Sequence, residues 1–249
     1  MTLSSHFCLH WLAAMGLACA SAMAQAAPFE DTIAQRTQAC TACHGNQGRA
    51  AADGYYPRLA GKPAGYLYNQ LLNFKEGRRH YGLMTQLVDP LTDAYLLEIA
   101  QYFSQIEAPY PAPLRTSTPA GVLDQGRQLV MQGDAARQVP ACVQCHGQAM
   151  TGVLPATPGL LGLPRDYVNA QLGAWKAGQR KGHAPDCMKA VVARLSDADI
   201  FAVSSWLAAQ AVPTNAHAVA QRPALPAGAK AVECGSAAAT TTAATKAQP

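Results

Sequence analysis

The sequence predicts an all-α chain with two similar domains in tandem, each wrapped around a covalently bound prosthetic group. Three observations predict this fold. A Cys-x-x-Cys-His motif occurs twice, at 40–44 and at 142–146. The segments after the two motifs are similar to each other, which indicates two related units rather than one large core. Their apolar residues recur with the spacing of a helix, and no segment shows the pattern of an extended strand.

The duplicated motif is typical of covalent attachment of c-type haem. Its two thiols add to the vinyl groups of one porphyrin, and the histidine that follows becomes the proximal ligand of the iron. We therefore expect two haem groups, with His44 and His146 as the proximal ligands. The cysteines expected to hold the haems are Cys40, Cys43, Cys142 and Cys145.

Two other interpretations of the motif are open. Cys-x-x-Cys also occurs as half of a zinc site and as a thioredoxin-like redox pair. A zinc site would leave the adjacent histidines unexplained. A redox pair is not normally duplicated with a histidine directly after each copy. The haem interpretation explains both histidines, so the sequence favours it.

Two methionines are the candidates for the sixth iron ligand. Met84 and Met188 occupy equivalent places in the two repeats, at an offset of 104 residues. Met131 precedes the second motif, and Met150 follows His146 too closely to reach the opposite face of a haem. A methionine can simply fill a core, but a duplicated position favours ligation. A thioether ligand stabilises ferrous iron and raises the potential, as an electron carrier needs.

The repeat sets the domain organisation. Residues 56–61 align with 157–162 at an offset of 101, and residues 91–93 align with 195–197 at an offset of 104. Proline and alanine dominate the segments outside the repeats, which predicts an extended linker and a disordered tail. The predicted parts are a signal peptide at 1–24, a first domain at 25–107, a linker at 108–119, a second domain at 120–212 and a low-complexity tail at 213–249.

Helices are expected after each motif. Leu96, Ile99, Ala100 and Phe103 have the spacing of one helix face, and the equivalent face comprises Ile200, Val203, Ser204 and Leu207. Ser196 and Asp199 have the spacing of a capping box. Gly126 is available for the close approach of another helix. The carbonyls of Pro57 and Pro158, in equivalent segments, are the candidate acceptors for the ring N–H of the two motif histidines.

The first residues predict export to the periplasm. No lysine, arginine or acidic residue occurs in 1–24, and an apolar stretch there ends in small residues suited to cleavage after Ala24 or Ala26. An uncleaved membrane anchor is the alternative. Of the eight cysteines, Cys8 and Cys19 would leave with the signal peptide and four would hold haem. Cys187 and Cys234 then remain as a pair in an oxidising compartment.

The chain resembles the cytochrome c4 family of two-haem cytochromes over about residues 30–210. The resemblance rests on both Cys-x-x-Cys-His motifs, on the Tyr-Pro-Arg-Leu-Ala-Gly segment and on the repeated Gln-Leu-x-x-Phe/Trp-Lys-x-Gly-x-Arg segment. It implies two class I cytochrome c domains with haems near a pseudo-twofold interface. It also implies histidine–methionine iron, with His44 and Met84 at one site and His146 and Met188 at the other.

Two departures from that pattern concern the second repeat. Arg79 and Met84 are five residues apart, whereas Arg180 and Met188 are eight apart, which indicates a three-residue insertion. The inserted loop contains His183 and Cys187, either of which could replace Met188 as ligand. The other departure is the tail with its cysteine. We hypothesise a Cys187–Cys234 disulfide that pins the tail over the distal side of the second haem.

The expected function is periplasmic electron transfer without catalysis. The predicted partners are redox proteins: a bc1-type complex or a dehydrogenase upstream and a terminal oxidase downstream. Association with a membrane would come through those partners, and nucleic acid is not expected. A cytochrome subunit of a periplasmic dehydrogenase is a related alternative, and a two-haem peroxidase is a distant one.

The positive charge of the chain is uneven. The net charge of +4 comes entirely from residues 116–249, and Arg180, Lys181 and Lys189 flank one short segment there. These residues could form a basic face that steers an acidic partner. An ordinary solvated surface is the alternative.

Overall fold

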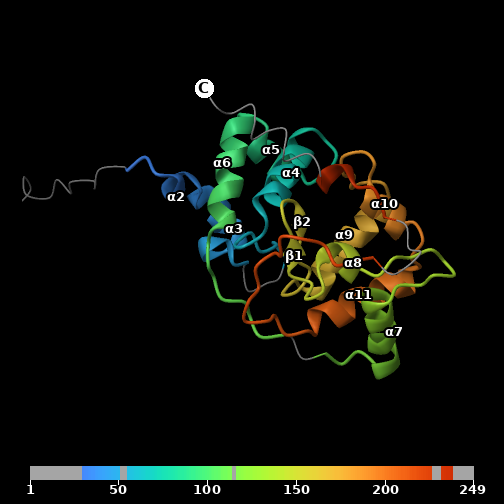
Figure 1. Ribbon diagram of the computed structural model, residues 1–249. Helices are drawn as coiled ribbons and strands as arrows, with labels where there is room; N and C mark the ends of the chain where they lie inside the picture. Colours follow the sequence, from blue (N-terminus) through green and yellow to red (C-terminus); the bar gives the residue numbers. More distant parts are fainter. Residues whose placement is uncertain (1–29, 51–54, 114–115, 226–230, 238–249) are drawn as a thin grey trace, which may run out of the picture.

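The computed structural model describes residues 30–50, 55–113, 116–225 and 231–237 (Figure 1). The signal peptide predicted at 1–24 lies outside these residues. Helices make up nearly all the regular secondary structure of the described part, so the all-α prediction is confirmed. None of the helices described is long and apolar enough to cross a membrane.

We refer to residues 30–107 as the first half and to residues 120–212 as the second half. The first half contains α2 (Ile33–Arg36), α3 (Gln38–His44), the 3-10 turn η1 (Asn46–Gly48), α4 (Ala64–Lys75), α5 (Gly82–Val88) and α6 (Asp93–Ser104). The second half contains α7 (Ala120–Met131), α8 (Val143–His146), β1 (Gly152–Val153), β2 (Thr157–Pro158), α9 (Arg165–Lys176), α10 (Cys187–Val192) and α11 (Asp197–Ala208).

One element differs from the sequence prediction. The strands β1 and β2 form a short antiparallel pair, in which Gly152 faces Pro158 and Val153 faces Thr157. Each strand has two residues, too few for an alternating pattern to appear in the sequence.

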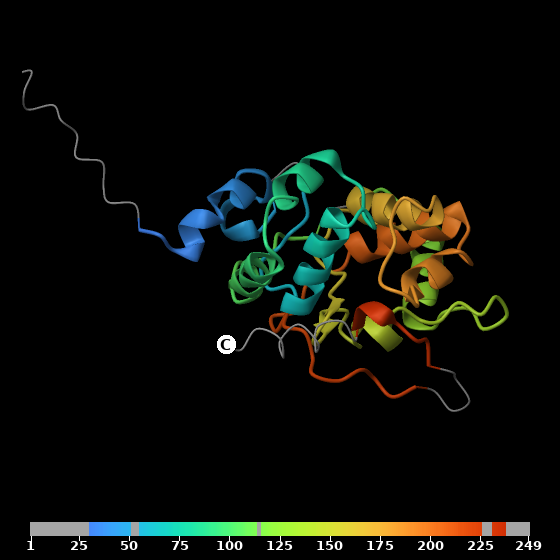
Figure 2. The ribbon, with the colours of Figure 1, turned by 90° about the horizontal axis from the view of Figure 1, so that it is seen from above.

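The structure confirms the internal repeat. Helices α4 and α9 have the same length and are displaced by 101 residues, and α6 and α11 have the same length and are displaced by 104 residues. The insertion therefore falls in the loop between α9 and α11, which carries α10. Seen from above, the helices of the two halves lie side by side (Figure 2).

Each half has its own apolar core. In the first half α4 packs against α6, and the predicted face of α6 is buried, with Leu96 fully inaccessible and Phe103 only 2% exposed. In the second half α11 packs against α7 and α9. The predicted face of α11 is buried in the same way, including Ile200 and Leu207. The helical periodicity of the sequence therefore identified both faces correctly.

Two local features of α11 also agree with the sequence. The Ser196 hydroxyl accepts from the backbone N–H of Asp199, and the Asp199 carboxylate accepts from the backbone N–H of Ser196, which completes the capping box. A Cβ atom at Gly126 of α7 would collide with the backbone of Ala202 in α11. Glycine at this position is what allows α7 and α11 to pack so closely.

The linker and the tail are both attached to the rest of the molecule. The Arg58 guanidinium donates to the carbonyl oxygens of Ala108 and Pro109 and lies 3.8 Å from the centre of the Tyr110 ring. Val219 in the tail exchanges backbone hydrogen bonds with β1 and Leu154. The described residues of the tail thus differ from the disorder expected of them, because backbone bonds that composition does not reveal hold them in place.

Candidate haem sites

The first cavity is built on the first Cys-x-x-Cys-His motif. Helix α3 contributes Cys40 and His44, and α5 contributes Met84 from another side. Cys43 is exposed and does not line the cavity. The remaining walls come mainly from apolar side chains of α4 and α6: Leu67, Leu71, Phe74, Ile99 and Phe103.

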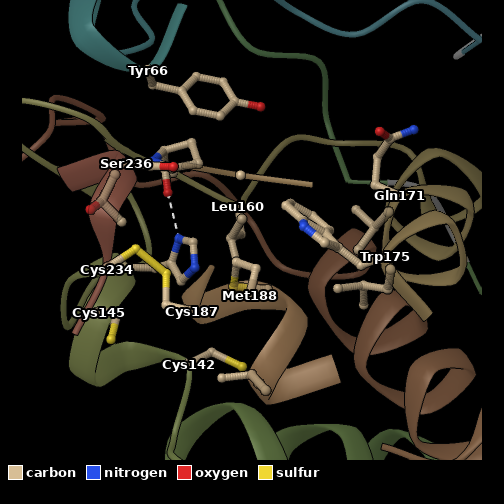
Figure 3. Close-up of a pocket in the computed structure, with 18 of the residues that line it drawn as sticks. Tyr66, Cys142, Cys145, Leu160, Gln171, Trp175, Cys187, Met188, Cys234 and Ser236 are labelled. Atoms are coloured by element: carbon tan, nitrogen blue, oxygen red, sulfur yellow. Dashed lines mark hydrogen bonds between the residues drawn. A yellow bond between two sulfur atoms is a disulfide. The ribbon is translucent and has the colours of Figure 1, made fainter. Parts of the chain in front are cut away.

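The second cavity repeats this arrangement around the second motif (Figure 3). Cys142 precedes α8, Cys145 lies within it, and Met188 reaches the same cavity from α10. Its apolar walls are formed by Leu160, Leu172, Val203 and Leu207. The predicted site residues His146, Cys142, Cys145 and Met188 therefore come together in one cavity.

Both motif histidines are oriented by a backbone carbonyl. His44 Nδ1 lies 2.8 Å from the carbonyl oxygen of Pro57, and His146 Nδ1 lies 2.7 Å from that of Pro158, marked by the dashed line in Figure 3. A carbonyl only accepts, so Nδ1–H is the donor and Nε2 keeps its lone pair. The two carbonyls predicted from the sequence are therefore the histidines' partners.

Burial keeps both imidazoles neutral. Each histidine is only 7% exposed. Desolvation lowers the pKa of His44 and of His146, and the bond to the proline carbonyl offsets only part of this effect. A neutral imidazole with Nδ1–H bonded and Nε2 available is the form that binds iron.

The four motif cysteines form no bond to another cysteine. Desolvation raises the pKa of Cys142 to about 12 and also raises the pKa of Cys40 and Cys145. Such thiols are protonated at neutral pH, and none of the four is used in a disulfide. They fit the thioether bonds through which c-type haem is attached.

The structure favours Met188 over His183 and Cys187 as the candidate sixth ligand of the second iron. Cys187 forms a disulfide with Cys234, as hypothesised from the sequence, so its sulfur is already bonded. His183 is not among the residues that line the second cavity, and its Nε2 lies 3.3 Å from the Arg78 guanidinium. Met150 is buried in the core of the second half at 2% exposure.

A reciprocal set of hydrogen bonds joins the two halves between the cavities. The side-chain oxygen of Gln70 accepts from Arg79 at 3.1 Å and from Arg180 at 2.8 Å. The side-chain oxygen of Gln171 accepts from the same two arginines, at 2.8 Å each. Arg79 also donates to the Tyr167 hydroxyl at 3.1 Å. Each glutamine is therefore shared by the arginines of both halves.

The aromatic partners of these arginines follow the repeat too. The Arg79 guanidinium lies 4.6 Å from the centre of the Phe74 ring, and that of Arg180 lies 3.8 Å from the centre of the Trp175 ring. Phe74 and Trp175 are equivalent at the offset of 101 residues. The interface is thus close to a twofold arrangement of matching residues.

Arg180 is buried and Arg79 is half-buried, and neither has a carboxylate partner among the ion pairs of the described residues. Arg180 is 4% exposed, and burial together with the charge of Arg79 lowers the pKa of Arg180 to about 10. Buried cations call for an anion nearby. Haem carries two carboxylate groups, and Arg180 lines both cavities. The chain therefore fits haem at both sites.

Arg180 does not belong to a basic surface. A basic face with Lys181 and Lys189 and an ordinary solvated surface were the two interpretations of the sequence, but the Arg180 side chain fits neither, because it is buried at the interface between the halves. Lys181 and Lys189 are exposed. The sequence showed Gln70 and Arg79 only as repeat matches of Gln171 and Arg180. No pattern in the amino-acid sequence indicated that these residues meet across the interface.

Comparisons with known proteins agree with this geometry. Residues 32–97 match the cytochrome c family. The chain is 38% identical to a thiosulfate dehydrogenase electron acceptor of Thiomonas intermedia (strain K12), over 73% of this chain and 83% of that protein. It is 35% identical to cytochrome c4 of Pseudomonas aeruginosa, over 68% of this chain and 82% of that protein.

The chain belongs to the cytochrome c4 family. Reduced recombinant cytochrome c4 from Pseudomonas stutzeri superposes with a TM-score of 0.62 at 32% identity, over 71% of this cytochrome and 96% of that chain. Thiosulfate dehydrogenase from Marichromatium purpuratum in its as-isolated form superposes with a TM-score of 0.65 at 30% identity, over 73% of this cytochrome. The cytochrome spans only 39% of the length of that chain.

Membership of the family decides among the functions left open by the sequence. This cytochrome carries two covalently bound haem c groups and is an electron carrier rather than an enzyme. The zinc and thioredoxin-like interpretations of the motif are thereby replaced, and the two-haem peroxidase is not supported.

Proposed function

We propose that this cytochrome accepts electrons from a thiosulfate dehydrogenase in the periplasm and passes them to an oxidase or a similar acceptor. One observation carries the proposal. Two relatives named as thiosulfate dehydrogenase electron acceptors match nearly their whole length, 83% of the Thiomonas intermedia protein and 94% of one from Stutzerimonas stutzeri (strain A1501) at 34% identity. The predicted signal peptide and the Cys187–Cys234 disulfide support an oxidising compartment outside the cytoplasm.

We assign the site residues by the repeat and by the cavities. Residues 25–107 form the domain in which Cys40 and Cys43 attach one haem and His44 and Met84 ligate its iron. Residues 120–212 form the second haem domain. Its attachment residues are Cys142 and Cys145, and its iron ligands are His146 and Met188.

The residues of each site prepare it for electron transfer. Bound haem supplies the one-electron chemistry. The carbonyl of Pro57 or Pro158 fixes the orientation of the imidazole and leaves Nε2 with its lone pair, so that Nε2 would be a good ligand for the haem iron. The methionine sulfur favours the ferrous state. The apolar walls exclude water, and Arg79 and Arg180 supply positive charge that would compensate the haem carboxylates.

The test uses the cytochrome with its haems and a purified thiosulfate dehydrogenase. The oxidised cytochrome is mixed with the enzyme and thiosulfate, and the reduced haem band is followed by stopped flow. We expect reduction of both haems at a rate that rises with enzyme concentration. Reduction no faster than in a mixture without the enzyme would contradict the proposal. Rapid reduction by a bc1-type complex in parallel would then favour the role of a general respiratory carrier.

A further inference from the structure

The mouth of the first cavity is an exposed apolar surface. Leu83 and Leu87 lie one turn apart on α5 and are 62% and 41% exposed, and Tyr55 is 61% exposed. Tyr55 and Leu87 line the cavity together with Met84. We refer to Tyr55, Leu83 and Leu87 as the α5 face. Large apolar side chains that gather at an opening mark an interaction surface, whereas single ones do not.

The equivalent surface of the second half is closed. At the offsets of the repeat, Cys187 replaces Leu83, Val191 replaces Leu87 and Ala156 replaces Tyr55. Cys187 is bonded to Cys234, Val191 is half-buried and Ala156 is only 6% exposed. The two halves have similar cavities but differ at the opening.

Residues 231–237, which we name the tail strap, are what closes it. The Cys234–Cys187 disulfide fixes the strap to the first residue of α10. The backbone N–H of Gly235 donates to the Pro185 carbonyl at 3.0 Å, and the side-chain amide of Asn69 in α4 donates to the Ser236 carbonyl at 2.8 Å. Figure 3 shows Cys234 and Ser236 beside Cys187 at the rim of the second cavity. The strap therefore occupies the place where a partner would approach the second site.

The α5 face is also free of charge. None of the seven residues of α5, Gly82–Val88, is ionisable. Around the second site, by contrast, Lys181 and Lys189 are exposed. A partner that covers the α5 face must match an uncharged surface, so salt should have little effect on its binding.

We propose that the α5 face is the docking surface for the electron-donating dehydrogenase, through an uncharged apolar patch around the donor's own redox centre. This inference rests on the proposed function. On docking, the reduced donor loses one electron and one ferric iron of the cytochrome becomes ferrous, with no bond made or broken. Electrons enter at the first site, because the tail strap denies the donor an equivalent approach to the second.

The test compares two variants in the haem-loaded cytochrome. Leu83→Glu puts charge on the α5 face at the one of its three residues that does not line the haem cavity. Phe201→Glu, which changes an apolar residue of α11 that is 41% exposed, is the matched control. Stopped flow gives the second-order rate constant for reduction by thiosulfate dehydrogenase with thiosulfate. Ascorbate serves as the small-molecule reductant that needs no docking.

We expect Leu83→Glu to lose about tenfold or more in the rate constant with the enzyme, while its rate with ascorbate and its methionine–iron absorption band stay unchanged. The control should keep its rate within about twofold, and the wild-type rate should vary little with salt. If the glutamate disturbs the absorption band, Leu83→Gln repeats the test with an uncharged polar side chain.

The possible failures are distinguishable. An unchanged enzyme rate in Leu83→Glu would overturn the docking surface and leave the proposed function intact. A control that falls as far as Leu83→Glu would overturn the docking surface as well. If the wild-type cytochrome is not reduced by the enzyme at all, the proposed function is wrong and this inference falls with it.

Discussion

In His44 and His146, one hydrogen bond at Nδ1 determines which ring nitrogen is available as a ligand. The bonds from Nδ1 to the Pro57 and Pro158 carbonyls fix both the tautomer and the ring orientation. These partners could be predicted because the two proline segments align within the repeat. A single copy would have offered a proline turn and no reason to choose its carbonyl.

Changing the proposed ligand Met84 should alter one haem and leave the other unchanged. We expect Met84→His to remove one of two methionine–iron absorption bands and to lower one midpoint potential by on the order of 0.2 V, because imidazole favours ferric iron more than a thioether does. Spectroelectrochemical titration measures both. Met150→Leu, at a buried methionine of the core, should leave both bands in place. Two intact bands in Met84→His would show that Met84 is not a ligand.

At the scale of single elements, the start of α11 depends on one buried carboxylate. Asp199 is 2% exposed. Its carboxylate accepts from Arg137 at 2.6 Å, from Gln125 at 2.9 Å and from the Ser196 backbone at 2.8 Å. Burial by itself raises the pKa of Asp199, but these hydrogen bonds hold it well below its usual range. Through them the carboxylate connects α11 with α7.

We expect Asp199→Asn to lower the free energy of unfolding at pH 7 by about 1–3 kcal/mol, since the ion pair between Arg137 and this buried carboxylate and a helix cap are lost. The carboxylate's folded pKa is depressed, so its stabilisation is complete above the unfolded pKa of about 3.9 and disappears as the pH falls below it. The difference between variant and wild type should therefore shrink below about pH 4. Denaturant titrations at several pH values measure it.

Asp197 provides the matched control in the same turn. Its side chain is 92% exposed although it pairs with Lys176, and exposed ion pairs contribute little. Asp197→Asn should change stability by less than about 0.5 kcal/mol. Equal losses in the two variants would mean that net charge, rather than the buried network of Asp199, determines the effect.

For the molecule as a whole, the disulfide is the strongest tie between the tail and the second half. Cys187 and Cys234 are 47 residues apart, and a cross-link over such a span restricts the unfolded chain. We expect Cys187→Ser with Cys234→Ser to lower the free energy of unfolding by about 2–4 kcal/mol and to keep both haems attached. Thermal unfolding with and without a dithiol reductant measures this. Reductant should shift the wild type towards the variant and leave the variant unchanged; sensitivity of the variant would contradict the assignment.

The sequence predicted the buried faces of individual helices better than it predicted how the two halves pack against each other. Helix faces such as Leu96 to Phe103 were predictable because burial imposes a period on the chain. The meeting of Arg79 with Gln171 was not, because the relative placement of the two halves leaves no local pattern. The disulfide of the tail was predicted from its cysteines, but the backbone hydrogen bonds of the tail were not, for a related reason. An alanine-rich composition indicates disorder, while a few backbone bonds and one cysteine override it.

The shared glutamines limit how the two halves of a duplicated chain can diverge. Gln70 serves the arginine of its own half and that of the other, and Gln171 does the same. Losing either glutamine would deprive both arginines of an acceptor at once. Either half produced alone would likewise present a guanidinium with one of its two acceptors missing. At this interface the two halves are therefore no longer independent. A substitution at any one of the four side chains changes the hydrogen bonds of side chains in both halves.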